Sequence, residues 1–314
     1  MEYNNIGKPL LTFPVPAEEE CLYSLLARYH QKSANRGSNY TSRDLFGGRI
    51  NLRYTLALPY RIECVDSWIS PGCGISTRTI RKSNTAQGYL EVSGIFPEGS
   101  FKKIAKARQS PGRGCIHTML SEAHGNKQGL YFCPQCIKED TLRAGEPYWH
   151  LSHQLLGVEY CPKHEELLQI YNVSPHEVSR KYFVIGNIRP EDIRLRKKGL
   201  LEEYRHQFIE LGKTIAVMVN QSAIKGYKEL MALYKKKNPK FDMAELSYLI
   251  DSYGGRGFIS MLYPDEKYGN LMGKIIRKGP VAIPPVIHAL IITVLELREE
   301  VQRGLCGQEI IKDN

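Results

Sequence analysis

Apolar residues recur at helical spacing in several stretches of the chain, and this pattern predicts a mainly α-helical protein. Between residues 22 and 29, three leucines and a tyrosine are spaced by three and four positions, so they share one face of a helix. The acidic run Glu18–Glu20 stands where carboxylates complement the positive start of that helix. Arg28 and His30 lie off the apolar face, so we expect a helix that buries a single stripe.

Two further short helices are predicted before residue 71. Thr41 and Asp44 form a pattern that caps a helix ending at Gly48. Residues 60 to 70 place their apolar side chains on one face and predict another helix. Three short helices joined by tight loops suit a helix-turn-helix unit, and a small helical bundle with no role in reading a DNA groove suits them equally.

The carboxyl-terminal half begins with a turn-rich and then strand-like segment between residues 173 and 187. A long helix is expected from about Leu200, because apolar residues recur there at alternating three and four positions. The Gly-Lys-Thr run at 212–214 resembles part of a phosphate-binding loop. Gln207 stands where such a loop needs glycine, so we reject a nucleotide site.

A helix pair is predicted near the carboxyl end. Asp242 and Glu245 cap its first helix, the glycine-rich run 254–257 ends it, and the second helix starts at Phe258. This pair suits a winged or plain helix-turn-helix module, and an ordinary helical hairpin fits the same pattern. A Pro-Pro pair at Pro284 opens the last helix, which is expected to bury one apolar stripe.

Composition describes a globular chain with an excess of positive charge. Its 314 residues are 42 % hydrophobic and 24 % charged, which is enough for two or three small domains. The formal net charge of +10 predicts a polyanionic partner or a strongly positive face. The first residues lack the basic and apolar regions of a signal peptide. The most apolar stretch, Val286–Leu295, is too short and too polar to span a bilayer.

Two matching turns carry the most specific chemical signal. Cys133-Pro-Gln-Cys136 and Cys161-Pro-Lys-His164 are separated by 24 residues, and each has proline directly after its first cysteine. Three thiolates and one imidazole complete the tetrahedral shell of a structural Zn²⁺ and leave no position for a catalytic water. A redox Cys-x-x-Cys pair would not need the second turn, and disulfide frameworks are typical of short secreted chains. We therefore predict a zinc site at Cys133, Cys136, Cys161 and His164.

The segment between the two turns is expected to continue as a short helix and to turn at Gly145–Pro147. From Tyr148 to Leu156 it predicts a helix or a strand that returns to the second turn. His150 and His153 lie near the ligands, but four better donors are already present. We interpret both histidines as hydrogen-bonding residues that support the ligands.

Lysine and arginine gather in several runs. Residues 78 to 113 contain eight of them against two glutamates, and further runs occur in the second half of the chain. Such runs contact phosphates in nucleic-acid-binding proteins and form solvated faces in many others. The candidate DNA-binding residues are Lys102, Lys103, Arg194, Arg196, Lys197, Lys198, Lys235, Lys236, Lys237, Lys274, Arg277 and Lys278.

Several motifs are similar, in the same order, to those of the TniQ/TnsD family of transposon target-selection proteins. The resemblance covers residues 13 to 168 and is weaker near residues 275–278 and 288–290. The two turns and the segment between them are its specific part. The motifs are Phe13-Pro-Val-Pro, Leu22-Tyr-Ser-Leu-Leu-Ala-Arg-Tyr-His30, Tyr131-Phe-Cys-Pro-Gln-Cys136, Glu146-Pro-Tyr-Trp-His150, Ser152-His-Gln-Leu155 and Gly157-Val-Glu-Tyr-Cys-Pro-Lys-His164.

The resemblance implies an adaptor without enzymatic activity. Such a protein brings a chosen target to an AAA+ ATPase regulator (TnsC), which then admits the transposase of a Tn7-like transposon. TnsD-like members read a target duplex directly, whereas TniQ-like members of RNA-guided transposons travel with a CRISPR effector complex. The implied partners are double-stranded DNA or that complex, together with the ATPase, with a homodimer as a further expectation. The implied location is the bacterial cytoplasm, with no membrane partner.

Two other functions remain open from the residues. His164, Asn172 and His176 occur in the order of a His-Asn-His nuclease, which a zinc site would staple, but the acid cluster that a catalytic metal needs is missing beside them. A general basic zinc-ribbon nucleic-acid binder is the other alternative, and it would need aromatic residues arranged to stack bases. TnsD-like chains usually extend beyond this length, so we expect a short member or part of a longer protein.

These predictions combine into three regions. We expect a helical, helix-turn-helix-like domain over residues 1–125 and a small Cys-Cys-Cys-His zinc-finger domain over 126–172. A second helical, helix-turn-helix-like domain is expected over 173–314. The predicted fold class is mainly α, with helical modules flanking the zinc finger.

Overall fold

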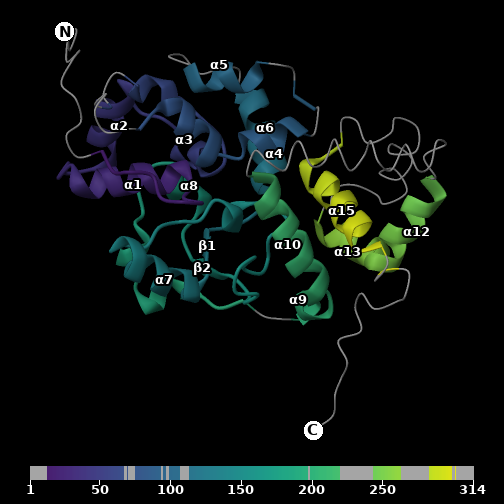
Figure 1. Cartoon of the computed structure of the whole chain (residues 1–314). Helices are drawn as coiled ribbons and strands as arrows, with labels where there is room; N and C mark the ends of the chain where they lie inside the picture. Colours follow the sequence, from purple (N-terminus) through teal and green to yellow (C-terminus); the bar gives the residue numbers. More distant parts are fainter. Residues whose placement is uncertain are drawn as a thin grey trace. The chain divides into compact units, whose positions relative to one another are not determined.

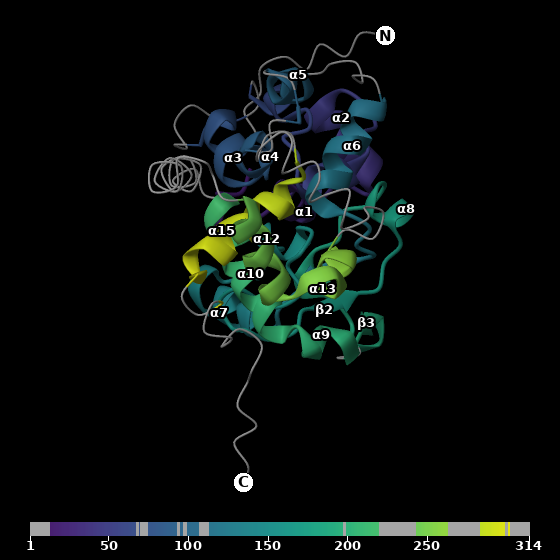
Figure 2. The ribbon, with the colours of Figure 1, turned by 90° about the vertical axis from the view of Figure 1, so that its right-hand side faces the viewer.

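The computed structural model describes residues 13–66, 69, 75–92, 95–96, 99–106, 113–196, 199–219, 243–262, 283–298 and 301. It is mainly α-helical, as predicted, with one small sheet (Figures 1 and 2). The chain divides into two compact units. The first comprises Met1–Gln87, Pro97–Leu155 and Leu168–Arg196, and the second comprises Gly88–Phe96, Leu156–Leu167 and Lys197–Asn314.

The first unit contains short helices and the three-stranded sheet. In Figure 1, α1, α2 and α3 gather in its purple-to-blue part. Its α-helices are α1 (Leu22–Lys32), α2 (Ser38–Phe46), α3 (Thr77–Ser83), α5 (Ser100–Lys106), α6 (Arg113–His124), α7 (Pro134–Ala144) and α8 (Pro175–Val178). Its 3-10 turns are η1 (Leu52–Leu56), η2 (Ile62–Val65), η4 (Ser152–Gln154), η5 (Ile185–Asn187) and η6 (Pro190–Asp192).

Helix α1 is buried on nearly every side, so the prediction of a single buried stripe is wrong. Eight successive residues, from Leu22 to Tyr29, are buried. Arg28 is among them because two carboxylates accompany it: its guanidinium nitrogens lie 2.7 Å from Glu20 and 2.8 Å from Glu146. Apolar spacing could not reveal this, since Glu146 lies 118 positions further along the chain.

Helix α2 starts at Ser38, three residues before the predicted cap at Thr41. Thr41 is buried within the helix, and its hydroxyl oxygen lies 2.6 Å from His30 Nδ1, so it does not cap the helix start. The helix ends before Gly47, whose φ of 70° is the left-handed conformation that glycine adopts without strain. The helix predicted over residues 60 to 70 is the 3-10 turn η2 in the described part of that range.

The sheet contains strands β1 (Leu130–Phe132), β2 (Gln169–Tyr171) and β3 (Ile193–Arg194), antiparallel and in that order. The register places Tyr131 opposite Ile170. The strand-like part of the segment predicted between residues 173 and 187 contains the 3-10 turn η5 instead. One of its carbonyl groups, that of Phe183, accepts a hydrogen bond of 2.7 Å from Trp149 Nε1. A side chain therefore takes the place of a strand partner.

The second unit is a group of helices, and Figures 1 and 2 both show α10, α12, α13 and α15 close together. Helix α15 packs against α10 and α12. The residues from Pro285 to Val294 are all buried, the polar His288 and Thr293 among them, so α15 is buried on every side rather than along the one predicted stripe. The helices are α4 (Gln87–Val92), α9 (Gly199–Glu203), α10 (Arg205–Val219), α12 (Met243–Tyr253), α13 (Gly255–Leu262) and α15 (Pro285–Glu296).

Aromatic packing and paired hydrogen bonds hold this group together. The ring of Phe258 lies 4.9 Å from that of Phe208 and 5.8 Å from that of Tyr253. Gln207 donates to the Tyr253 carbonyl (3.0 Å), and the Tyr253 hydroxyl donates to the Gln207 carbonyl (2.8 Å), which fastens α10 to α12. The predicted helix pair is present as α12 and α13, but α13 begins at Gly255 and not at the predicted Phe258, and the predicted cap Asp242 lies outside the described residues. The long helix predicted from Leu200 is divided at Tyr204 into α9 and α10.

Within the residues that the structure describes, none of the helices combines the length and the apolar character that crossing a membrane requires.

Candidate metal centre

The first turn of the cluster is built where a strand meets a helix. Strand β1 leads into Cys133, which is the extended N-cap of α7, and Pro134 occupies the first helical position. Proline suits this position because its fixed φ matches the helix and its missing N–H is not needed there. Cys136 then falls in the first turn of α7. Both thiols are nearly inaccessible to solvent.

The second turn is a tight loop closed by its own backbone. Tyr160 and Leu167 form an isolated antiparallel bridge, and the Cys161 amide donates to the Glu166 carbonyl at 2.8 Å. The Glu165 amide donates back to the Cys161 carbonyl, also at 2.8 Å, and Glu165 adopts a left-handed φ of 54°. This geometry brings the His164 amide to 3.4 Å from Cys161 Sγ, where it donates a hydrogen bond that favours the thiolate.

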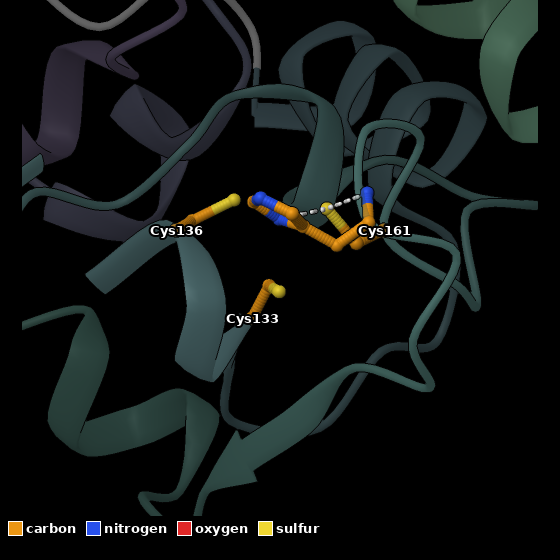
Figure 3. Close-up of side chains that lie close together, drawn as sticks. Cys133, Cys136 and Cys161 are labelled. Carbon is orange, nitrogen blue, oxygen red and sulfur yellow. Dashed lines mark hydrogen bonds between the residues drawn. The ribbon is translucent and has the colours of Figure 1, made fainter. Parts of the chain in front are cut away.

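The four predicted ligands come together. One donor atom from each of Cys133, Cys136, Cys161 and His164 lies within 4.8 Å of the other three. Figure 3 shows the three labelled cysteine side chains directed toward a common space, from two separate parts of the backbone. Sequence spacing therefore located a real side-chain cluster.

The distances suit a tetrahedral metal ion. Bond lengths of about 2.3 Å to sulfur and about 2.05 Å to nitrogen imply about 3.5 Å between a sulfur and a nitrogen ligand, and about 3.8 Å between two sulfurs. Cys161 Sγ lies 3.5 Å from His164 Nδ1. Three buried thiols and an imidazole gathered at this range fit a bound metal ion.

A second group, Cys136, His150 and His153, also lies within ligand distance. Burial disfavours a charged His150 ring, but hydrogen bonds to Asp140 (2.8 Å) and Glu19 (3.4 Å) raise the pKa of His150 to about 9. Both ring nitrogens of His150 therefore already face a carboxylate, Nε2 that of Asp140 and Nδ1 that of Glu19. His150 thus ties Asp140 of α7 to Glu19, which lies just before α1, in agreement with the supporting role predicted for it.

Polar side chains hold the irregular segment between residues 148 and 156, where the sequence predicted a helix or a strand. Gln154 accepts a hydrogen bond from the Tyr131 amide (3.1 Å) and donates one to the Tyr131 carbonyl (2.7 Å). His124 Nδ1 lies 2.6 Å from the Gln154 carbonyl, and the Lys127 ammonium donates to the His153 carbonyl at 3.0 Å. These bonds satisfy backbone groups that no regular element pairs. The prediction was wrong because such bonds leave no periodicity in a sequence.

The candidate DNA-binding residues are only partly described by the structure. Lys102 and Lys103 are exposed on α5, and Arg194 is exposed in β3. Arg196 is half-buried, with its guanidinium carbon 5.4 Å from the centre of the Tyr131 ring. These four residues stay predictions as DNA contacts. The others, Lys197, Lys198, Lys235, Lys236, Lys237, Lys274, Arg277 and Lys278, lie outside the described residues.

Sequence reasoning missed a buried charge network that joins α1 to Glu146, which follows α7 in the chain. Glu20 is fully buried and accepts from Arg28, which also donates to Glu146, and Glu146 in turn pairs with Lys32 at 2.6 Å. Desolvation raises the pKa of Glu20, although the neighbouring Arg28 charge opposes that rise. Such pairs cost much more to break than to keep, because a lone buried charge would remain. The Glu18–Glu20 run carried a signal, but it was assigned to the helix start.

Together, the fold and the cluster define a mainly helical protein with a closed Cys-Cys-Cys-His group that can hold a metal ion. The sequence profile of the TniQ family matches residues 11–168, which include all four residues of the cluster. The chain belongs to the TniQ family.

The chain is also similar to a named transposition protein. Over 168 residues the chain is 24 % identical to the transposon Tn7 transposition protein TnsD of Escherichia coli. The match covers 50 % of this chain and 31 % of that protein, so it spans about a third of the length of the relative.

Proposed function

We propose that this chain selects the target site for a Tn7-like transposon. The observation that carries the proposal is the family match over residues 11–168, a segment that contains the whole metal cluster and its buried supports. The likeness to a TnsD transposition protein points to the same class of function. In this role the chain binds target DNA, or a CRISPR complex bound to it, and recruits the AAA+ ATPase regulator TnsC.

The proposal includes a structural Zn²⁺ held by Cys133, Cys136, Cys161 and His164. Three thiolates and one imidazole are typical of zinc sites that stabilise a fold, and the tight spacing described above supports this ion. The ion would join two turns that lie 24 residues apart in sequence, and it would leave no coordination position for water. Its contribution is therefore to stability and not to chemistry.

The proposal also treats the chain as an adaptor in the cytoplasm rather than a nuclease. His176, which the alternative of a His-Asn-His nuclease requires, belongs to neither metal-binding group among the described residues. It is exposed on the short helix α8. DNA cleavage that depends on Mg²⁺, survives repurification and is lost in His176→Ala would support the nuclease and contradict this proposal.

Mapping of insertion sites tests the function directly. The transposon is mobilised in cells with its transposase and ATPase genes, with and without the gene for this chain, and new insertions are sequenced. We expect insertions to concentrate at one site or at RNA-chosen sites only when the chain is present. Cys133→Ser should abolish this concentration, whereas Cys64→Ser, at a half-buried cysteine outside the cluster, should preserve it. An insertion pattern that is the same without the chain would contradict the proposal.

Binding to duplex DNA separates the two routes to a target. Affinity for the attachment-site duplex and for a scrambled duplex is measured over a series of salt concentrations. A large ratio that persists at high salt indicates a chain that reads bases itself. Equal affinities that fall together with salt indicate backbone contacts only, as expected for a chain that travels with an RNA-guided complex.

A further inference from the structure

A cavity of about 710 Å³ lies in the first unit, away from the metal cluster in sequence. Three separate stretches line it: the start of α2, the residues just before η1, and the residues just after α8. The volume is that of a site for a nucleotide-sized group rather than for a single small ion. The lining residues that matter here are Ser38, Asn39, Arg49, Asn51, Arg180 and Lys181.

The charge of this cavity is positive. Arg49, Arg180 and Lys181 all line it, and none of its described lining residues is acidic. Lys181 lies 3.5 Å from a Glu177 oxygen, but in the described part of the chain no carboxylate pairs with Arg49 or Arg180. A guanidinium offers several N–H donors in a plane, a geometry that matches the oxygens of a phosphate.

The walls of the cavity are fixed by bonds that do not use the cationic groups. Ser38 Oγ accepts from the Tyr182 amide (3.2 Å), and the Leu52 amide donates to the Ser179 carbonyl (3.1 Å). The Tyr23 hydroxyl donates to the Lys181 carbonyl at 2.7 Å. The buried residues Tyr23, Leu52 and Tyr182 thus hold the three stretches in place. The backbone of the site is therefore preformed, and a ligand would have to order only the exposed side chains of Arg49, Arg180 and Lys181.

The remaining polar groups suit the same ligand. Helix α2 has a glycine N-cap that supplies no side-chain hydrogen bond, and its first two residues, Ser38 and Asn39, line the cavity. The first N–H groups of a helix lack partners within it and favour anions. The N–H groups at the start of α2 therefore favour the same anion as Arg49 and Arg180, and the two arginines are the main evidence for the site.

We propose that this cavity binds the phosphodiester backbone of duplex DNA, with Arg49 and Arg180 as the phosphate-contacting residues. The inference rests on the proposed function, because DNA is its ligand. Phosphate contacts give affinity without base recognition, so this site would position the chain on any duplex and would not choose the sequence.

The test compares two pairs of substitutions in the full chain. Arg49→Ala/Arg180→Ala removes the two cavity arginines. Arg189→Ala/Lys138→Ala is the matched control, since both of its residues are exposed in the first unit, carry the same total charge and lie outside the cavity. Binding of a fluorescent duplex is measured over a salt series, with circular dichroism to verify that both variants fold. Arg49→Lys/Arg180→Lys preserves charge but not the planar donor geometry.

We expect the cavity variant to bind about tenfold more weakly than the wild type at low salt. The slope of log affinity against log salt should become shallower by about 2, one for each lost phosphate contact. The lysine variant should retain the slope with reduced affinity, and the control should resemble the wild type. Hydrogen exchange should show that duplex protects residues 49–51 and 179–181, and that inorganic phosphate at equal concentration does not.

Three results would overturn the inference, and they have different meanings. If the wild type binds duplex and the cavity variant behaves like the control, the cavity is not the contact, although the proposed function stands. If single-stranded RNA of the same length is bound by the cavity in preference to duplex, the ligand is wrong. If the wild type binds no duplex at any salt concentration, both this site and direct DNA binding fail, and only the route through a CRISPR complex remains.

Discussion

The segment around the metal cluster and the helical group of the second unit are stabilised in different ways. Between Leu130 and Tyr171, regular structure is limited to two short strands, α7 and a 3-10 turn, and polar groups such as Gln154 and His150 make the connections. In the helical group, α15 is buried over ten successive residues, and Phe258 packs among three aromatic rings.

The difference has a physical consequence. Hydrogen bonds and metal ligands act in fixed directions, so the loss of one atom removes a whole connection and leaves its partner unsatisfied. Apolar packing is spread over many contacts, so the loss of one side chain weakens the core in proportion to the volume removed. We therefore expect a single substitution to unfold the cluster segment completely, whereas a single substitution in the helical group should lower the free energy of unfolding in proportion to the volume removed.

Removal of the metal should have the largest effect. Structural Zn²⁺ contributes on the order of 10 kcal/mol to the folding of small metal-binding domains, because the unfolded chain has no preformed site. We expect Cys133→Ala, or treatment of the wild type with a strong chelator, to abolish the native near-ultraviolet signal of the buried Trp149. Cys64→Ala is the matched control and should leave both signal and metal content unchanged. A native signal that persists after complete removal of the metal would show that polar side chains alone hold the segment.

Truncation in the aromatic core of the helical group should have a smaller but still large effect. Phe258→Ala is expected to lower the free energy of unfolding by about 4 kcal/mol, since its ring is buried and contacts Tyr204, Phe208 and Tyr253. Chemical denaturation measures this loss. Although Cys161 and His164 belong to the same unit as Phe258, metal content should stay at the wild-type level, because none of the four ligands lies in α13. Loss of metal in this variant would contradict the separate stabilisation of the two regions.

The ion network around Arg28 tests whether a single directional contact has a large effect on stability, and none of its residues is a metal ligand. Arg28→Ala should lower the free energy of unfolding by about 3 kcal/mol, since it leaves Glu20 buried without its cation. Arg143→Ala removes an exposed arginine that pairs with Glu18 (3.2 Å), lies 3.9 Å from Asp140 and donates to the Tyr148 hydroxyl (2.6 Å). Water can replace this exposed group and Asp140 retains His150, so the expected loss is below about 1 kcal/mol. Equal losses in the two variants would mean that burial does not decide the strength of these pairs.

The smallest effect is expected in the dependence of stability on pH. Burial lowers the pKa of His124 to about 3, so the folded protein holds this ring neutral. In the unfolded chain the pKa is about 6.5, so below that pH the unfolded state binds the extra proton and stability falls as pH falls. Above about pH 6.5 neither state binds it, and the contribution of His124 does not change.

The variant His124→Gln removes this titration. Between about pH 6 and pH 4, the free energy of unfolding should fall less steeply in the variant than in the wild type, by up to about 1.4 kcal/mol per pH unit. Denaturation at matched pH values measures both slopes. Parallel profiles would show that the ring is protonated in the folded protein, or that it is exposed.

The sequence predicted those features that depend on local spacing. The two turns placed Cys133 and His164 in one cluster because ligand spacing within each turn is a short-range property. Apolar periodicity located α1, α10 and α15, and capping and glycine signals located α12 and α13. It did not predict that Arg28 is buried, since its partner Glu146 lies far along the chain. It also missed the form of the 148–156 segment, whose structure comes from Gln154 and His124 rather than from periodic hydrogen bonds.

The central claim is that the four-residue cluster holds one structural zinc ion. X-ray absorption spectroscopy of the purified chain, combined with a measurement of its metal content, tests this claim most directly. The account predicts one zinc ion per chain, bound by three sulfur ligands at about 2.3 Å and one nitrogen ligand at about 2.0 Å. Cys133→Ala should lose the ion, and Cys64→Ala should retain it. Folded protein without a stoichiometric metal ion, or a metal shell dominated by oxygen, would contradict the account.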